Sequence, residues 1–212
     1  MTVEAASFDP TGEVSTRLRD EASGWNLDGT CLEKYEPYIV CGIHLGSGPY
    51  AHTSIDAQVH IAKYTLVLLC VDELEIPNSA LEEFMERLYS GHSQLHPMLD
   101  ILVHILQDMK LFWSTFLVTQ IVKSTVDFIN SVVLDEKIET MSLRPSSLPF
   151  VKFKRFYNGI GEAYTAFIWD KDNFPDLCSY IQALPSVFPT STLSHVTDSY
   201  NRDINIFCDY VK

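Results

Sequence analysis

The stretch IAKYTLVLLCVDE, residues 61–73, decides the fold of this chain. Together with the residues from Ser54 onward it is apolar on nearly all sides, which in a globular protein is typical of a central helix surrounded by others. The run closes on Asp72 and Glu73, followed by Glu75. An ionised carboxylate is not tolerated in an apolar core, so these side chains must face solvent, a cavity or a cation. The sequence therefore predicts a central helix over residues 54–71, with an acidic end suited to a metal ion.

Helical patterns continue on both sides of this segment. Ser79 and Glu82 form a capping box after Pro77, and Gly91 suits the end of the helix that follows. Pro97 suits the first turn of the next helix. Further helices are expected over residues 111–133, 150–168, the segment before Pro185, and from about residue 190 to the last residues. Three glycines and a proline in residues 42–50 indicate a loop. We expect an all-α fold.

Composition limits the function. A chain of 212 residues with 46% hydrophobic residues suits one domain, which we place at residues 31–212 after a poorly ordered leader, residues 1–30. A net charge of -13 argues against nucleic-acid binding. The apolar run at residues 65–71 is too short to span a membrane. Five cysteines without a C-x-x-C pair, and no secretory signal, favour reduced thiols in the cytoplasm.

A second polar motif lies near the last residues. Asn201, Asn205 and Asp209 recur every four positions, so on a helix their oxygen atoms project from one face. Such a stripe is typical of a solvated helix face. It also offers the oxygen ligands that Mg²⁺ prefers, and it could meet the carboxylates of Asp72 and Glu73 across a cavity.

Other candidate sites have simpler alternatives. His92 and His96 have a spacing that zinc can use, but Gly91 and Pro97 interrupt the helix between them and no third ligand lies nearby. The cysteines lack an adjacent histidine, which favours packing over nucleophilic catalysis. Arg155 lies among aromatic residues, where an arginine is usually a structural ion pair.

Five segments, in this order, resemble the trichodiene synthase family of fungal sesquiterpene cyclases. They extend over nearly three quarters of the chain and include a helix similar to the one that carries the family's aspartate-rich motif, an R-x-x-N-G-x-G segment, and the second metal motif. The segments are IAKYTLVLLCVDE (61–73), IVKSTVDF (121–128), FKRFYNGIG (153–161), AFIWDKDNFPD (166–176) and NRDINIFCD (201–209).

The resemblance implies an all-helical terpene synthase fold in which Mg²⁺ ions and an arginine bind the diphosphate of farnesyl diphosphate and promote its departure. Asp72 matches the first aspartate of the acidic motif, and Arg155 matches the diphosphate-sensing arginine; both are expected to be catalytic. The implied metal ligands are Asp72, Glu73, Asn201, Asn205 and Asp209. The implied substrate contacts are Arg155, Asn201, Tyr64, Phe128 and Tyr157.

This chain departs from the family pattern at several of these positions. Glu73 stands where a second aspartate is usual, Asn205 replaces a serine or threonine, and Asp209 replaces a glutamate, so the metal motifs are degenerate. The chain also stops three residues after Asp209, where family members continue through further helices. We therefore expect a bundle incomplete at its C-terminus. Either a second copy of the chain covers the open cavity, or the protein is a truncated relative with impaired activity.

Overall fold

The computed structural model describes residues 12–25, 34–74, 76–139, 141, 150, 154, 157–158 and 160–187. Within these ranges the chain is helical and contains no strand, which confirms the predicted all-α class. The helices are α1 Glu13–Ser23, α2 Glu36–Ser47, α3 Ile55–Glu73, α4 Asn78–Glu82, α5 Phe84–Ser90, α6 Pro97–Asp108, the 3₁₀ turn η2 Met109–Leu111, α7 Thr115–Glu139, α9 Ile160–Ala166 and α10 Cys178–Val187.

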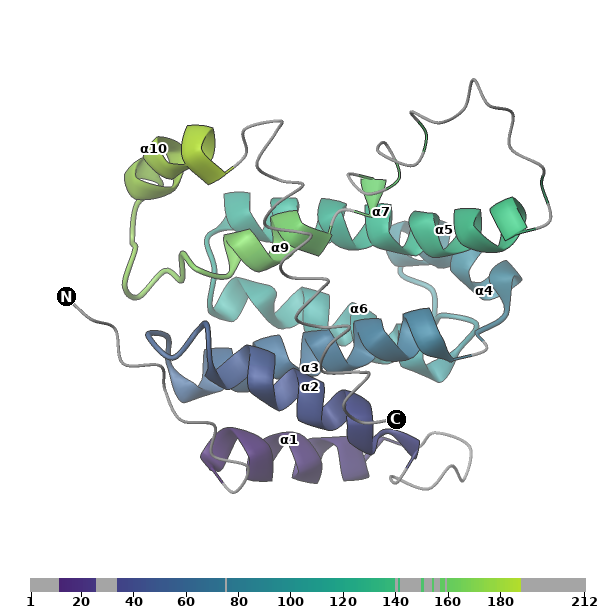
Figure 1. Ribbon diagram of the computed structural model, residues 1–212, viewed down its shortest axis with the longest axis horizontal. Helices are drawn as coiled ribbons and strands as arrows, with labels where there is room; N and C mark the ends of the chain where they lie inside the picture. The colour runs from purple at the N-terminus through teal and green to yellow at the C-terminus, as the bar shows by residue number, and fades with distance from the viewer. Residues whose placement is uncertain are drawn as a thin grey trace.

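Helix α3 is the centre of the bundle, as its sequence predicts. It packs against α2, α6 and α1, while α7 packs against α9 (Figure 1). Its first turn is capped by Ser54, whose Oγ accepts a hydrogen bond from the amide of Ala57 at 3.2 Å. Most α3 side chains are buried, and the apolar ones join a single core with residues from every helix around them. A helix without a polar face is stable in water only when other helices cover it on all sides.

Helix α1 corrects the expected leader. Residues 13–23 are helical, and Val14, Leu18 and Ala22 bury one stripe of the helix against the bundle. Leu18 is fully buried. Charged residues between the apolar ones concealed this stripe, because their partners lie far along the chain: Arg19 pairs with Glu36.

The glycine-rich segment at residues 42–50 was expected to be a loop, but most of it belongs to helix α2. The helix continues to Ser47, and only then does the chain turn towards α3. Gly42 and Gly46 face α3, where a Cβ atom would lie 2.6 Å from the carbonyl oxygen of Ala62 or 2.5 Å from that of Gln58. The two glycines therefore permit close packing of two helices.

Local signals were correct at some helix ends and wrong at others. Gly91 ends α5 with a φ of 68°, and Pro97 begins α6. The capping box is absent: α4 begins at Asn78 after Pro77, without a side-chain cap, and a break at Glu83 separates α4 from α5. Within the described part of the segment expected to be helical at 150–168, α9 spans Ile160–Ala166. The helix expected after residue 190 lies outside the described residues.

Buried His60 gives α3 a pH-sensitive contact. Its Nε2 donates to the carbonyl of Ile105 at 2.9 Å. Burial lowers the pKa of His60 from 6.5 to about 4; nearby Lys63 lowers it further, while the hydrogen bond and the charges of Asp108 and Glu21 oppose the shift. The unfolded chain therefore takes up a proton near pH 6.5, whereas folded His60 does so only near pH 4.

Acid is therefore expected to destabilise the fold through His60. Between pH 7 and pH 5 its contribution to the free energy of unfolding should fall by about 2 kcal/mol, because protons bind the unfolded state more strongly in this range. Urea unfolding of the wild type and of His60→Gln at both pH values measures this contribution. The His60→Gln variant should lose that part of the pH dependence, whereas His92→Gln, at an exposed position, should keep it. Equal pH dependence in all three proteins would contradict the assignment.

Candidate functional site

Asp72 and Glu73 are the last two residues of α3, and both are exposed to solvent. Their position follows from the chain: the apolar part of α3 is buried up to Val71, and the helix leaves the core where the carboxylates begin. The first predicted metal motif is thus placed where an ion could reach it.

The pKa of Asp72 is raised above its ordinary value. Partial burial among the surrounding protein atoms is the largest cause, and the neighbouring charge of Glu73 adds to it. The residue still reaches solvent, which limits the effect of burial. Lys154 opposes both causes with its positive charge. Two adjacent carboxylates that repel each other at the rim of the core would be stabilised by a cation.

Lys154 belongs to the same end of the bundle. Its ammonium forms an ion pair with Asp135 of α7, while its charge also acts on Asp72 of α3. Lys137 of α7 pairs with Glu82 of α4 at 2.6 Å, which ties the same end of α7 to the segment that follows α3. Figure 1 shows α3 and α7 ending on the side where α4 lies. The structure thus gathers carboxylates and lysines at the end of α3.

The aromatic residues predicted to contact substrate lie deeper. Tyr64 is fully buried; its hydroxyl is 2.9 Å from Oγ1 of Thr125, and its ring centroid is 5.2 Å from that of Phe167. Phe128 is also in the core, whereas Tyr157 is half-buried. The ring and hydroxyl contacts account for Tyr64 as a packing residue, so its contact with substrate stays a prediction.

Four predicted site residues lie outside the described residues: Arg155, Asn201, Asn205 and Asp209. The meeting of the two metal motifs across a cavity therefore stays a prediction. Among the side chains that the structure does place, no three histidine, cysteine or acidic groups are grouped closely enough to hold a metal ion.

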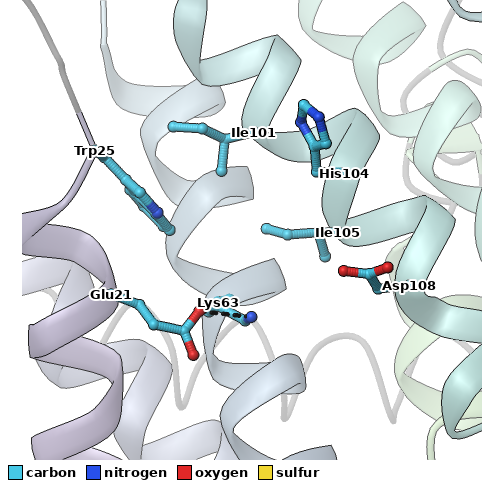
Figure 2. Close-up of a pocket in the computed structure, with 7 residues that line it drawn as sticks. All are labelled: Glu21, Trp25, Lys63, Ile101, His104, Ile105 and Asp108. Atoms are coloured by element: carbon cyan, nitrogen blue, oxygen red, sulfur yellow. Dashed lines mark ion pairs between the residues drawn. The ribbon is translucent and has the colours of Figure 1, made fainter.

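A separate hollow of about 230 Å³ lies between α1, α3 and α6 (Figure 2). Lys63 pairs there with Glu21 at 2.7 Å. Nine residues, or about 14 Å along the helix, separate Lys63 from Asp72. This distance and the charged lining make the hollow unsuitable as the apolar cavity for a prenyl chain. The lining residues are Glu21, Trp25, Lys63, Ile101, His104, Ile105 and Asp108.

The alternative sites are explained by local structure. His96 caps α6, because its Nδ1 accepts from the amide of Met98 at 3.2 Å. Cys41 and Cys70 are buried and form no disulfide, as packing residues would be. Burial raises the pKa of the Cys70 thiol to about 12, which argues against a thiolate nucleophile.

One helix in the described part of the chain, residues 115–138, is long and apolar enough to cross a membrane by length and composition alone. It belongs to α7, which packs against α9 and α4 and contributes Leu117, Ile121 and Ile129 to the core. A core helix passes the same test of length and composition, so this is weak support for a membrane span.

The described helices, with a buried central helix that carries adjacent carboxylates to one end of the bundle, define a terpene synthase-type fold. The sequence model of the trichodiene synthase (TRI5) family matches residues 43–195. The chain belongs to this family, which confirms the resemblance seen in its motifs.

Several fungal terpene synthases are similar in sequence to this chain. Monoterpene synthase 25 of Postia placenta is 29% identical over 206 residues, which cover 95% of this chain and 61% of the relative. Terpene synthase 29 of the same fungus is 33% identical over 156 residues, 73% of this chain and 46% of the relative. An (E)-beta farnesene synthase of Metarhizium brunneum is 25% identical over 76% of this chain and 50% of its own length. The chain thus spans about half the length of these relatives.

Lys154 and Asp135 were missed by the sequence reasoning. Nothing local distinguishes them from other charged residues on helices, and they are 19 positions apart. The one available signal was that Lys154 directly precedes Arg155 in the segment that resembles the family's diphosphate-sensing motif.

Proposed function

We propose that the protein is a sesquiterpene synthase that uses Mg²⁺ to ionise farnesyl diphosphate and then cyclises the resulting cation. The observation that carries this proposal is the delivery of Asp72 and Glu73 to the end of α3 beside Lys154, in a chain that matches the family over residues 43–195. Carboxylates and a lysine at the rim of an apolar bundle suit a substrate with an anionic head and a hydrocarbon tail.

The residues fit magnesium in the described part of the site. Mg²⁺ prefers oxygen ligands and is commonly held by one or two carboxylates together with substrate phosphates. Asp72 and Glu73 supply two carboxylates. Burial and the charge of Glu73 raise the pKa of Asp72, and the opposing charge of Lys154 does not outweigh them. We propose Asn201, Asn205 and Asp209 as the second set of ligands.

The remaining roles belong to the chain's own side chains. We propose that Arg155 and Asn201 orient the diphosphate, and that Tyr64, Phe128 and Tyr157 line the hydrocarbon side. Bound Mg²⁺ would neutralise the departing diphosphate. Aromatic faces stabilise a nearby cation by about 0.5–2 kcal/mol each. We propose that the apolar core around α3 shields the hydrocarbon side from water.

The direct test is product formation. Purified protein with Mg²⁺ and farnesyl diphosphate should release a terpene that gas chromatography with mass spectrometry detects, and a boiled sample or one with EDTA should not. Geranyl diphosphate is assayed in parallel, because one relative is named a monoterpene synthase. No product from either substrate, while that relative works in the same assay, would contradict catalysis by this chain.

The alternative is an impaired family member with at most a binding role. The substitutions at Glu73, Asn205 and Asp209 favour it, because Mg²⁺ demands near-ideal octahedral geometry. An impaired protein that still binds would show a thermal shift with Mg²⁺ and pyrophosphate but no product. Activity gained by the double variant Glu73→Asp with Asn205→Ser would then identify the lost ligands as the cause.

The proposal extends to the surroundings of the protein. The described cysteines Cys41, Cys70 and Cys178 form no disulfide, which fits a reducing compartment, and we propose the cytoplasm. We also propose that the chain assembles as a homo-oligomer. Analytical ultracentrifugation, with and without Mg²⁺ and pyrophosphate, tests this assembly.

A further inference from the structure

Lys154 is the described cation whose charge acts on Asp72, and α7 determines its position. Its ammonium pairs with Asp135, and the two side chains are 36% and 42% exposed. The Oδ1 atom of Asp135 is itself buried and, apart from this ion pair, has no hydrogen-bond partner among the described residues. A buried carboxylate oxygen is costly to leave unpaired. Asp135 therefore holds the lysine in place while solvent, and hence a ligand, can still reach it.

The ion pair does not saturate the lysine. An ammonium group has three hydrogens to donate, and one acceptor oxygen engages one of them. Lysine is also a common ligand of phosphate, acting as a compact positive charge. Lys154 can therefore keep its contact with Asp135 and donate to an anion at the same time.

The negative charges around Lys154 mean that an anion could bind here only with the help of a fixed cation. Asp72, Glu73 and Asp135 place three carboxylates at this end of the bundle, and they would repel an anion that approached without a fixed cation. A metal ion on Asp72 would screen one side of that anion. Lys154, which is paired with Asp135 of α7, supplies positive charge from outside α3.

We propose that Lys154 is a diphosphate-binding residue and that Asp135 is its positioning residue, an inference that rests on the proposed function. The ligand chemistry is a diphosphate group, whether it is carried by a prenyl substrate or released as pyrophosphate. Arg155, the next residue in the chain, is the position at which the family resemblance placed a diphosphate contact. The segment would thus offer two consecutive cations.

The test is binding of inorganic pyrophosphate with Mg²⁺, measured by isothermal titration calorimetry. Lys154→Gln removes the charge but can still donate to Asp135, which preserves the fold. We expect at least about a 10-fold loss of affinity, as for a lost hydrogen bond to a charged group. Lys154→Arg should remain within about threefold of the wild type, because the charge is retained. Asp135→Asn should weaken binding less than Lys154→Gln does.

Lys123→Gln is the matched control. Lys123 also forms exposed ion pairs that involve α7, with Asp127 and Glu162, but it lies 12 residues before Asp135, or about 18 Å along the helix. Its variant should bind like the wild type. If Lys154→Gln also binds like the wild type, the inference is overturned and the proposed function stands. If the wild type binds no pyrophosphate with Mg²⁺, the proposed function fails first. Circular dichroism confirms that each variant is folded.

Discussion

Replacing Gly46 with alanine is expected to lower the free energy of unfolding by about 3 kcal/mol, at the upper end of the usual cost of overpacking. The added Cβ would lie 2.5 Å from the carbonyl oxygen of Gln58 and 2.9 Å from Cβ of Ala62. The oxygen belongs to the backbone of buried helix α3, so no side-chain rotation relieves the contact. The two helices must separate instead, and dispersion contacts between them are lost.

Gly42→Ala should cost a similar amount, because its Cβ would lie 2.6 Å from the carbonyl oxygen of Ala62. The double variant should cost about 4 kcal/mol, less than the sum of the single variants. One separation of α2 from α3 relieves both contacts, and neighbouring substitutions that share a backbone shift are not additive. Urea unfolding of the two single variants and the double variant measures this coupling.

Ser47→Ala is the control on the same helix. The Ser47 hydroxyl donates to the carbonyl of Ile43 within α2, so its loss should change stability by less than about 1 kcal/mol. If Gly42→Ala and Gly46→Ala lower the free energy of unfolding as little as Ser47→Ala does, α2 and α3 do not pack as closely as described.

These glycines show where sequence reasoning about the fold fails. Local signals carried much of the prediction: the apolar run of α3, the turn at Gly91 and the helix start at Pro97 all depend on residues close in sequence. A glycine can indicate either a turn or a close contact between helices. Here the second interpretation is correct because of the α3 residues that face α2, and those residues are not neighbours of the glycines in the sequence.

Helix α1 illustrates the same difficulty with charge. Val14, Leu18 and Ala22 follow one helix face and were readable in principle, but the polar composition around them indicated a loose leader. Arg17 pairs with Asp56 and Arg19 with Glu36, so charges that seem to favour solvent in fact attach the helix. Ion pairs between distant segments leave no local pattern.

In the candidate site, too, local sequence predicts some features, while others depend on residues far apart in the chain. The exposed position of Asp72 and Glu73 at the end of α3 was predicted correctly, because a carboxylate after a buried helix must leave the apolar core, while their role as metal ligands stays a prediction. The pairing of Lys154 with Asp135 joins two residues that are 19 positions apart, and no periodicity encodes it. The aromatic residues carry little information about substrate, since Tyr64 and Phe128 are what any helical core contains.

Asp72→Asn should reduce the turnover of prenyl diphosphate at least about 100-fold, as is typical for the loss of one group that stabilises developing charge. Asparagine keeps the shape of the side chain and one oxygen, so the fold should be unaffected. It removes the negative charge that would attract a metal ion. Mg²⁺ with pyrophosphate is expected to raise the melting temperature of the wild type, and the variant should lose this rise, a measurement that requires no turnover.

Asp56→Asn is the matched control at the other end of α3. Asp56 is also an exposed aspartate on this helix, pairs with Arg17 at 2.7 Å, and lies 16 residues, or about 24 Å, from Asp72. Its substitution should leave turnover and the ligand-dependent melting shift unchanged. If both variants lost turnover and the melting shift equally, the effect would come from a general loss of stability when α3 loses a charge. If neither variant lost them, Asp72 would not belong to the site. A loss confined to Asp72→Asn would tie the chemistry to the point where the buried helix leaves the core.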